Sequence, residues 1–229
     1  EALSAGAPSW QYLRAAFPGW RISWDNSCPC AELPDDWETF FGQALSQHQR
    51  KKQRRFRRNL GNAYPGQVRF WRVETPEQLK RALDRLFELH RQKWEAIGAP
   101  SIFENEALVR FHHDFASRAL QRGWLRTYVL EVDSEIVAVE YGFRSGDSIY
   151  AYQAAFDVDW SEFSPGHLMT QHAIEQAIAE GAQIYDFLRG DEDYKYRGAT
   201  GECRDLSAVL PANRWAGLIL DAIDWLARL

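Results

Sequence analysis

The stretch SPGHLMTQHAIEQAIAEGAQIYDFLRGDEDYKYR, residues 164–197, decides the fold of this 229-residue chain. Ser164 is expected to cap a helix and Pro165 to occupy its first position. This helix is predicted over residues 166–180, and Gly181 ends it. The apolar run IYDFL, residues 184–188, then predicts a short strand. A helix that leads into an apolar strand is typical of a domain in which helices pack on a sheet.

On the N-terminal side of this stretch the sequence alternates between apolar and polar residues. The alternation predicts strands at 125–132, 136–143 and 148–156, joined by short polar turns in an antiparallel meander. Further upstream, strands are predicted at 20–24 and 67–73. One long helix is predicted over about 36–62. A second is predicted over 76–97, with Thr75 as its cap and Pro76 at its first position, and a third over 105–122. Downstream, a strand is predicted near 204–210.

We therefore predict an α/β fold with a mixed, mainly antiparallel central sheet flanked by helices. The predicted division has three parts. Residues 1–18 form an N-terminal linker or tail, residues 19–212 form the domain, and residues 213–229 form a C-terminal amphipathic helix that packs on it.

The net charge of −5 conceals a local excess of basic residues. Residues 50–58 contain seven basic side chains and no acidic one, so the remainder of the chain sums to −12. This pattern argues against a general polyanion-binding protein and leaves one local basic helix. The chain has no apolar run of about 20 residues, and three cysteines are typical of a reducing compartment, so a cytoplasmic location is predicted. Because the sequence starts at Glu1, we expect a fragment that lacks an N-terminal domain.

Two features of residues 164–197 indicate chemistry. The free amides and the dipole of a helix start form a site for an anion, and Gly166 is expected to let a pyrophosphate approach the backbone. Asp186 lies within an apolar strand, where a carboxylate is costly unless it is paired, and Arg189, Lys195 and Arg197 are near in sequence. The alternative interpretations are a well-capped helix and a structural salt-bridge network.

This stretch resembles the core of the CelD/BcsL-like acetyltransferases, a family of the GNAT superfamily related to the FemAB-type transferases. The segment QRKKQRRFRRNL, residues 49–60, resembles the family's N-terminal basic helix, and the resemblance covers about residues 45–197. Gly198 stands where members often have Trp. The residues that match the family pattern are Ser164, Pro165, Gly166, Leu168, Gly181, Asp186, Phe187, Gly190, Asp191, Glu192, Tyr194 and Lys195.

The resemblance implies a GNAT-like fold whose splayed central strands hold the pantetheine of acetyl-CoA or another acyl-CoA, with the pyrophosphate at the helix that starts near Gly166. No metal is implied. The donor-binding residues that follow from the resemblance are Ala154 and Phe156, through their backbone groups, and Ser164, Gly166, His167 and Leu168 in the phosphate-facing turn.

Acyl transfer requires a base that removes a proton from the acceptor and a group that stabilises or protonates the leaving thiolate. Glu140, in IVAVEYGF, and Asp186 are the candidate bases. Tyr194 or Tyr196 is the candidate acid, and Lys195 is expected to stabilise negative charge. Asp186 and Lys195 rank highest because both match the family pattern. The alternative interpretation of Glu140 is an outward polar residue in an exposed strand.

The predicted function is transfer of an acyl group from acyl-CoA to an amine or hydroxyl of a small molecule or saccharide, such as a sugar nucleotide or polysaccharide precursor. One alternative is a FemAB-like transferase that uses charged tRNA, because a basic helix suits a phosphate backbone. Another alternative is a non-catalytic scaffold in polysaccharide synthesis or export. His112, His113 and Asp114 offer no third ligand at helical spacing, so a metal site is not expected there.

Overall fold

The computed structural model of the chain describes residues 2–4, 12, 15, 21–190 and 192–209. The predicted helix at 213–229 and most of the predicted linker lie outside these residues. The chain divides into two compact units, residues 1–28 with 202–229 and residues 29–201, which we describe separately. In the first unit, β1 (Ala2–Ser4) pairs antiparallel with β8 (Gly201–Val209), which overlaps the strand predicted near 204–210.

The second unit contains a mixed, mainly antiparallel sheet, as predicted. Its strand order is β7-β6-β5-β4-β3, and the end of β2 (Arg21–Glu32) pairs with β7. Every neighbouring pair is antiparallel except β6 and β7, which are parallel. The strands are β3 (Val68–Arg72), β4 (Leu125–Val132), β5 (Glu135–Ser145), β6 (Ser148–Phe156) and β7 (Ile184–Asp186).

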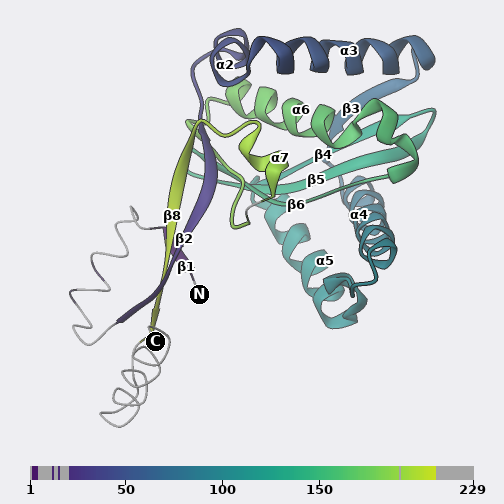
Figure 1. Ribbon diagram of the computed structural model, residues 1–229. Helices are drawn as coiled ribbons and strands as arrows, with labels where there is room; N and C mark the ends of the chain where they lie inside the picture. The colour runs from purple at the N-terminus through teal and green to yellow at the C-terminus, as the bar shows by residue number, and fades with distance from the viewer. Residues whose placement is uncertain (1, 5–11, 13–14, 16–20, 191, 210–229) are drawn as a thin grey trace. The chain divides into compact units, whose positions relative to one another are not determined.

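Helices cover both faces of this sheet (Figure 1). On one face lies α6 (Pro165–Ala179), and α3 (Gln47–Ala63) packs outside it. On the other face lie α4 (Pro76–Ala96) and α5 (Glu106–Gln121). Thr75 caps α4 through its side chain, as predicted, and Asn105, which was predicted to begin the next helix, caps α5 through its side chain.

Alternation along the strands divides the core into two layers. Leu130 and Ala138 face α6, whereas their neighbours Val129 and Val139 belong to the cluster that contains the apolar sides of α4 and α5. Because both faces are covered, β4 is buried along its whole length. The register of the sheet is therefore fixed, since a one-residue slip would exchange the two layers.

The long helix predicted over 36–62 is wrong, because the chain forms two helices there. The first, α2 (Trp37–Ala44), ends at Leu45, which has an extended backbone. Ser46 then starts α3 with a capping box, in which its hydroxyl accepts the Gln49 amide and the Gln49 side chain accepts the Ser46 amide. The signal for this break was present in the sequence as Ser followed three residues later by Gln.

A bulge interrupts the pairing of β5 with β6. Tyr141 pairs with Gln153 and Gly142 pairs with Ala151, so Tyr152 is an extra residue on β6. The strands approach closely here, because a Cβ atom on Gly142 would lie 2.7 Å from the carbonyl oxygen of Tyr150. Only glycine fits at this position without a shift of the backbone.

The parallel strands β6 and β7 stay together for only three residue pairs. Pairing runs from Ser148 with Ile184 to Tyr150 with Asp186, after which β7 ends while β6 continues to Phe156. Beyond Tyr150, the backbone of β6 is therefore no longer paired with β7. This divergence places an opening in the middle of the sheet.

Three short elements complete the second unit: the 3-10 helices η1 (Ile102–Glu104) and η2 (Val158–Phe163) and the helix α7 (Asp193–Tyr196). Among the described residues, no helix is both long and apolar enough to cross a bilayer.

Candidate functional site

A cavity of about 130 Å³ lies where β6 and β7 diverge. Residues of β6 form one wall, the segment after β7 forms the other, and Glu140 of β5 and Thr170 of α6 also line it. The lining residues are Glu140, Ala151, Tyr152, Gln153, Ala154, Thr170, Phe187, Leu188, Arg189, Glu192 and Lys195. Two of the predicted catalytic residues, Glu140 and Lys195, therefore meet in one cavity, together with the predicted donor-binding residue Ala154.

Glu140 is the most deeply buried acid of this cavity, with 4% of its surface exposed. The hydroxyl of Thr170 donates to its Oε2 at 3.1 Å, and the hydroxyl of Tyr185 on β7 donates to its Oε1. Burial raises the pKa of Glu140 from 4.5 to about 7, although the bond from Thr170 opposes this rise. Glu140 is thus a carboxyl group that can release and take up a proton near neutral pH, not an outward residue of an exposed strand.

Lys195 is held at the opposite wall by the segment that follows β7. Its ammonium group donates to the carbonyl oxygen of Arg189 and forms an ion pair with Glu192 at 3.0 Å. Gly190 has a φ of 124°, and a Cβ atom there would lie 2.6 Å from the Lys195 ammonium. The glycine therefore lets the backbone turn tightly around a buried cation.

Asp186, the other candidate base, is buried but is not among the residues that line the cavity. Its Oδ1 accepts the Leu188 amide at 2.7 Å, and Leu188 has a left-handed backbone with a φ of 57°. Asp186 thus stabilises the turn by which the chain leaves β7. Tyr196 is 45% exposed and likewise does not line the cavity.

The start of α6 differs in detail from its prediction. Ser164 occupies the position before the helix, but its backbone is left-handed and its side chain makes no capping hydrogen bond, so the predicted side-chain cap is wrong. The space beside Gly166 is filled by Phe156, because a Cβ atom on Gly166 would lie 2.9 Å from that ring. Glycine is required here for the packing of Phe156 on the first turn. Phe156 itself is 37% exposed.

The first turn of α6 also separates the predicted phosphate-facing residues into two kinds. Leu168 is buried in the core, and its amide already donates to the carbonyl oxygen of Ser164 at 3.2 Å. Gly166 and His167 precede the first such bond, and amides at these positions have no acceptor within their own helix. The helix dipole adds partial positive charge at the same place.

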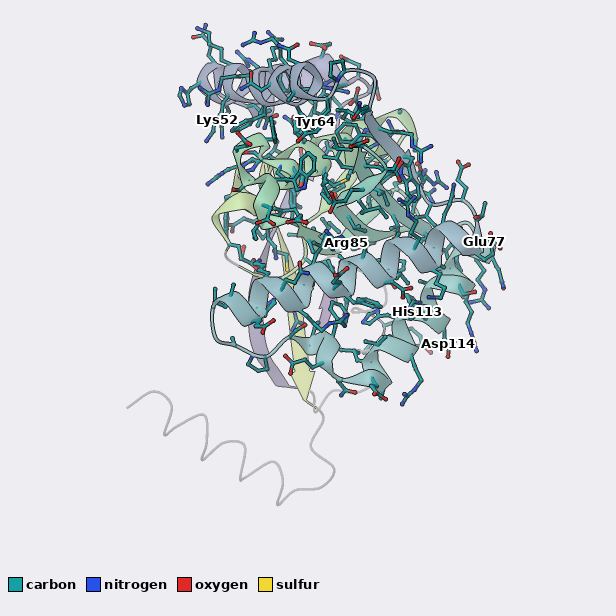
Figure 2. All side chains as sticks on the ribbon, turned by 90° about the vertical axis from the view of Figure 1, so that its right-hand side faces the viewer. Lys52, Tyr64, Glu77, Arg85, His113 and Asp114 are labelled. Carbon is teal, nitrogen blue, oxygen red and sulfur yellow. The ribbon has the colours of Figure 1, made fainter. Side chains whose placement is uncertain are left out.

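Cationic side chains surround this helix start. Arg197 contacts the Nε2 atom of His167 at 2.6 Å. Burial lowers the pKa of His167, and the positive charges of Arg197 and of Lys52 on α3 lower it further. Lys52 lies on the α3 side of the sheet, whereas Arg85 of α4 lies on the other side (Figure 2), where it forms an ion pair with Asp157. The positive charge that acts on the N-terminus of α6 therefore comes from Lys52 and Arg197.

Several residues of the site were not predicted from the sequence. Thr170 and Tyr185 hydrogen-bond to Glu140, and Tyr152 and Arg189 line the cavity. Tyr185 is adjacent to Asp186 in the run IYDFL, so the phenol could have been noted there. Its contact with Glu140 spans 45 residues and depends on the register of three strands. Among the described residues, no group of three or more His, Cys, Asp or Glu side chains is placed to hold a metal ion.

The protein-family model described as "Acetyltransferase (GNAT) domain" matches residues 47–196. No curated protein matches the chain. Among solved structures, FemX is similar with a TM-score of 0.62 at 13% identity, over 88% of this chain and 69% of FemX. A conserved protein of unknown function from Bacteroides thetaiotaomicron VPI-5482 has a TM-score of 0.57 at 17% identity, over 88% of this chain and 66% of that one.

The structure of L-PGS from Bacillus licheniformis is similar with a TM-score of 0.55 at 10% identity, over 97% of this chain and 71% of that chain. The present chain therefore spans about two thirds of the length of these structures. At such low identity, the similarity shows a shared fold.

Proposed function

Because the chain belongs to the acetyltransferase (GNAT) domain family, we propose that it transfers an acyl group from acyl-CoA to an amine or hydroxyl acceptor. The observation that supports this proposal most directly is Glu140, a buried carboxyl group with a pKa of about 7 in the cavity between β6 and β7. A base with a pKa near the working pH is well suited to take a proton from an attacking nucleophile.

In the proposed reaction, the Glu140 carboxylate takes a proton from a neutral amine or a hydroxyl group as that group attacks the thioester carbonyl carbon. A bond forms between the acceptor and the acyl carbon, and the carbon–sulfur bond breaks to release the CoA thiolate, which then takes up a proton. Thr170 and Tyr185 donate to the same carboxylate, so they keep its oxygens oriented through the proton transfer.

Lys195 supplies positive charge where negative charge develops. An ammonium group has three hydrogens, and Arg189 and Glu192 accept two of them. Because Lys195 lines the cavity, we assign it to stabilisation of the thioester oxygen or the leaving thiolate. We assign the base to Glu140 and not to Asp186, whose contact with Leu188 serves the turn after β7.

The donor is proposed to lie along the edge of β6 that β7 leaves uncovered. Backbone groups from Ala154 to Phe156 are available to the pantetheine there, and its phosphates would reach the start of α6. Helix amides, the helix dipole and the cations Lys52 and Arg197 all favour an anion at that position.

Calorimetric titration of the wild-type chain with acetyl-CoA and with acetyl-pantetheine, which lacks the nucleotide and its phosphates, tests the donor. We expect the Lys52→Gln/Arg197→Gln variant to bind acetyl-CoA about tenfold more weakly and acetyl-pantetheine unchanged. Gly166→Ala should also weaken acetyl-CoA binding because it displaces Phe156, whereas Gly42→Ala, which has no atom within 4 Å of the new methyl group, is the matched control. Absence of acetyl-CoA binding at millimolar concentration would contradict the proposal.

We further propose the finer assignment to the CelD/BcsL-like acetyltransferases, with a saccharide such as a sugar nucleotide or polysaccharide precursor as the acceptor. The sequence pattern from Pro165 to Lys195 supports this assignment. Thiol release from acetyl-CoA in the presence of a panel of sugar nucleotides tests it, and acylation of simple amines alone would argue against it.

A second candidate function is aminoacyl transfer from charged tRNA, which the surface of α3 favours. Lys51, Arg54, Arg55 and Arg58 are exposed, and within the described part of the chain no ion pair joins them to a carboxylate. Aligned exposed cations suit a nucleic-acid backbone. A salt-dependent affinity for tRNA that decreases in the Arg54→Gln/Arg55→Gln/Arg58→Gln variant, without a change in acetyl-CoA affinity, would support this candidate.

A further inference from the structure

Tyr152 occupies an unusual position between the cavity and the opposite face of the sheet. It is the extra residue of the β6 bulge, it lines the cavity that contains Glu140, and 40% of its surface is exposed. Its ring lies over the face that α4 and α5 cover, where it contacts the rings of Tyr141 and Phe143. Glu140 instead contacts Thr170 of α6 on the other face. Residues that line the cavity therefore contact both faces of the sheet.

His112 of α5 fixes the position of this phenol. Its Nε2 atom lies 3.3 Å from the Tyr152 hydroxyl, and only 3% of its surface is exposed. Aromatic rings of Phe103, Phe111 and Tyr141 pack around it. Burial lowers the pKa of His112 and raises that of Tyr152, so both groups are neutral near pH 7.

A neutral histidine has one N–H group, and its position decides what Tyr152 can donate to. Among the described residues, the buried Nδ1 atom of His112 has no hydrogen-bond partner. An unpaired buried N–H is rarer than an unpaired buried acceptor, so the proton is better placed on Nε2, where it donates to the Tyr152 oxygen. The hydroxyl hydrogen of Tyr152 is then not used by His112 and is available to another acceptor.

Aromatic side chains continue from Tyr152 onto the surface of α5. Phe115 contacts Phe143, and Phe111 stacks on Phe115 with an interplanar angle of 8°. Phe111 is 55% exposed and Phe115 is 38% exposed. Exposed aromatic faces beside a polar donor suit a ring that is apolar on one face and polar at its rim.

We propose that Tyr152, positioned by His112, forms the acceptor side of the active site and selects acceptors that contain a ring. This proposal rests on the proposed acyl transfer. The donor phosphates would lie at α6, so the α5 face is left for the acceptor. The ring rests on Phe111 and Phe115, and Tyr152 donates a hydrogen bond to an oxygen of the acceptor other than the nucleophilic group. Glu140 removes the proton of the attacking amine or hydroxyl, whose lone pair stays available for the thioester carbonyl carbon. Tyr152 would contact the acceptor, and His112 is a positioning residue.

Thiol release from acetyl-CoA, measured with three amines, tests the proposal. The ring amines are glucosamine, whose amino group is on the ring, and tyramine, whose amino group is joined to the ring by two carbons; ethanolamine is the ringless control. We expect a ring amine to have a KM at least tenfold below that of ethanolamine. Tyr152→Phe should raise this KM about fivefold to tenfold with little change in kcat, as expected for loss of one hydrogen bond. Preference for glucosamine would identify a saccharide acceptor, and preference for tyramine an aromatic one.

The role of His112 is tested by a double-mutant cycle. His112→Phe keeps a ring of similar size and removes the bond to the phenol, so its effect on KM should equal that of Tyr152→Phe and should not add to it. Tyr150→Phe, two residues earlier on β6 and outside the cavity lining, is the matched control. If His112→Phe does not fold, the acceptor KM of Tyr152→Phe alone tests whether the Tyr152 hydroxyl binds the acceptor.

Two results would overturn this inference. One is equal use of ethanolamine and the ring amines, or use of none of them by a protein that binds acetyl-CoA. The other is an unchanged acceptor KM in Tyr152→Phe and in Phe111→Ala. Acetyl-CoA affinity should stay constant in all these variants. Loss of acetyl-CoA binding by the wild-type chain would instead contradict the proposed acyl transfer itself.

Discussion

Glu140 and Asp186 are both buried carboxyl groups on central strands of one sheet, but the backbone around them differs. Asp186 lies where β7 is still paired with β6, and its oxygen accepts the amide of a turn. Glu140 lies where β6 has separated from β7, so its carboxyl group borders an open cavity. We therefore expect the same residue class to serve the backbone in the closed part of the strand pair and chemistry in the open part.

The largest effect should come from removal of the carboxylate in the open part. We expect Glu140→Gln to lower kcat/KM by about 10²–10⁴-fold, because a general base contributes by about this factor. The variant should be no less stable than the wild-type chain at pH 8, because it removes a carboxylate whose ionisation is opposed by burial. Activity assays and thermal unfolding measure the two effects. A fully active Glu140→Gln variant would contradict the assignment of the base to Glu140 and not to Asp186.

The pH dependence should report the same group. Because the base must be ionised and its pKa is about 7, kcat/KM should fall about tenfold for each pH unit below 7 and level off above it. Stability should change in the opposite direction. The folded pKa lies above the unfolded value of 4.5, so this contribution is fully present below pH 4.5 and is lost as the pH rises through 7. In Glu140→Gln both changes should disappear.

A smaller loss is expected at the opposite wall of the cavity. Lys195→Met should reduce kcat by about tenfold to a hundredfold, because it removes a positive charge near the reacting thioester. The pH midpoint near 7 should remain, since Glu140 is intact. Lys80→Met, which alters an exposed lysine paired with Asp84, provides the control. A shifted pH midpoint with unchanged kcat would show that Lys195 acts on Glu140 and not on the acyl group.

The smallest effect on activity should come from the closed part of the strand pair. Asp186→Ala removes the acceptor of the Leu188 amide, so we expect it to lower the free energy of unfolding by about 1–3 kcal/mol. Its kcat/KM, measured on folded protein, should stay within about tenfold of the wild-type value. Denaturant unfolding and activity assays separate the two. A loss as large as that of Glu140→Gln would assign the base to Asp186.

The elements of the fold were largely predictable from the sequence because their signals are local. Alternation and polar turns predicted β4, β5 and β6, and Thr75 with Pro76 predicted the start of α4. The break between α2 and α3 was missed because a basic segment with few apolar residues hides the helical period, although the capping box of Ser46 and Gln49 marks it.

The site was less predictable because its contacts are long-range. Glu140 was a candidate by composition, but its burial depends on Thr170 and Tyr185, which reach it from α6 and β7. The bulge at Tyr152 depends on the register between two strands and is not visible in either strand alone. The family resemblance selected both Asp186 and Lys195 by their positions in the sequence. Only the structure shows that Lys195 lines the cavity and that Asp186 does not.

The short pairing of β6 with β7 has a consequence for how this domain can change over evolutionary time. The width of the proposed donor slot is determined by where two backbones separate, and few side-chain substitutions would alter that point. The proposed acceptor side, by contrast, consists of side chains from α5 and the β6 bulge, each replaceable without moving the slot. Such a division would let descendants of one gene keep a common donor while they acquire new acceptors one substitution at a time.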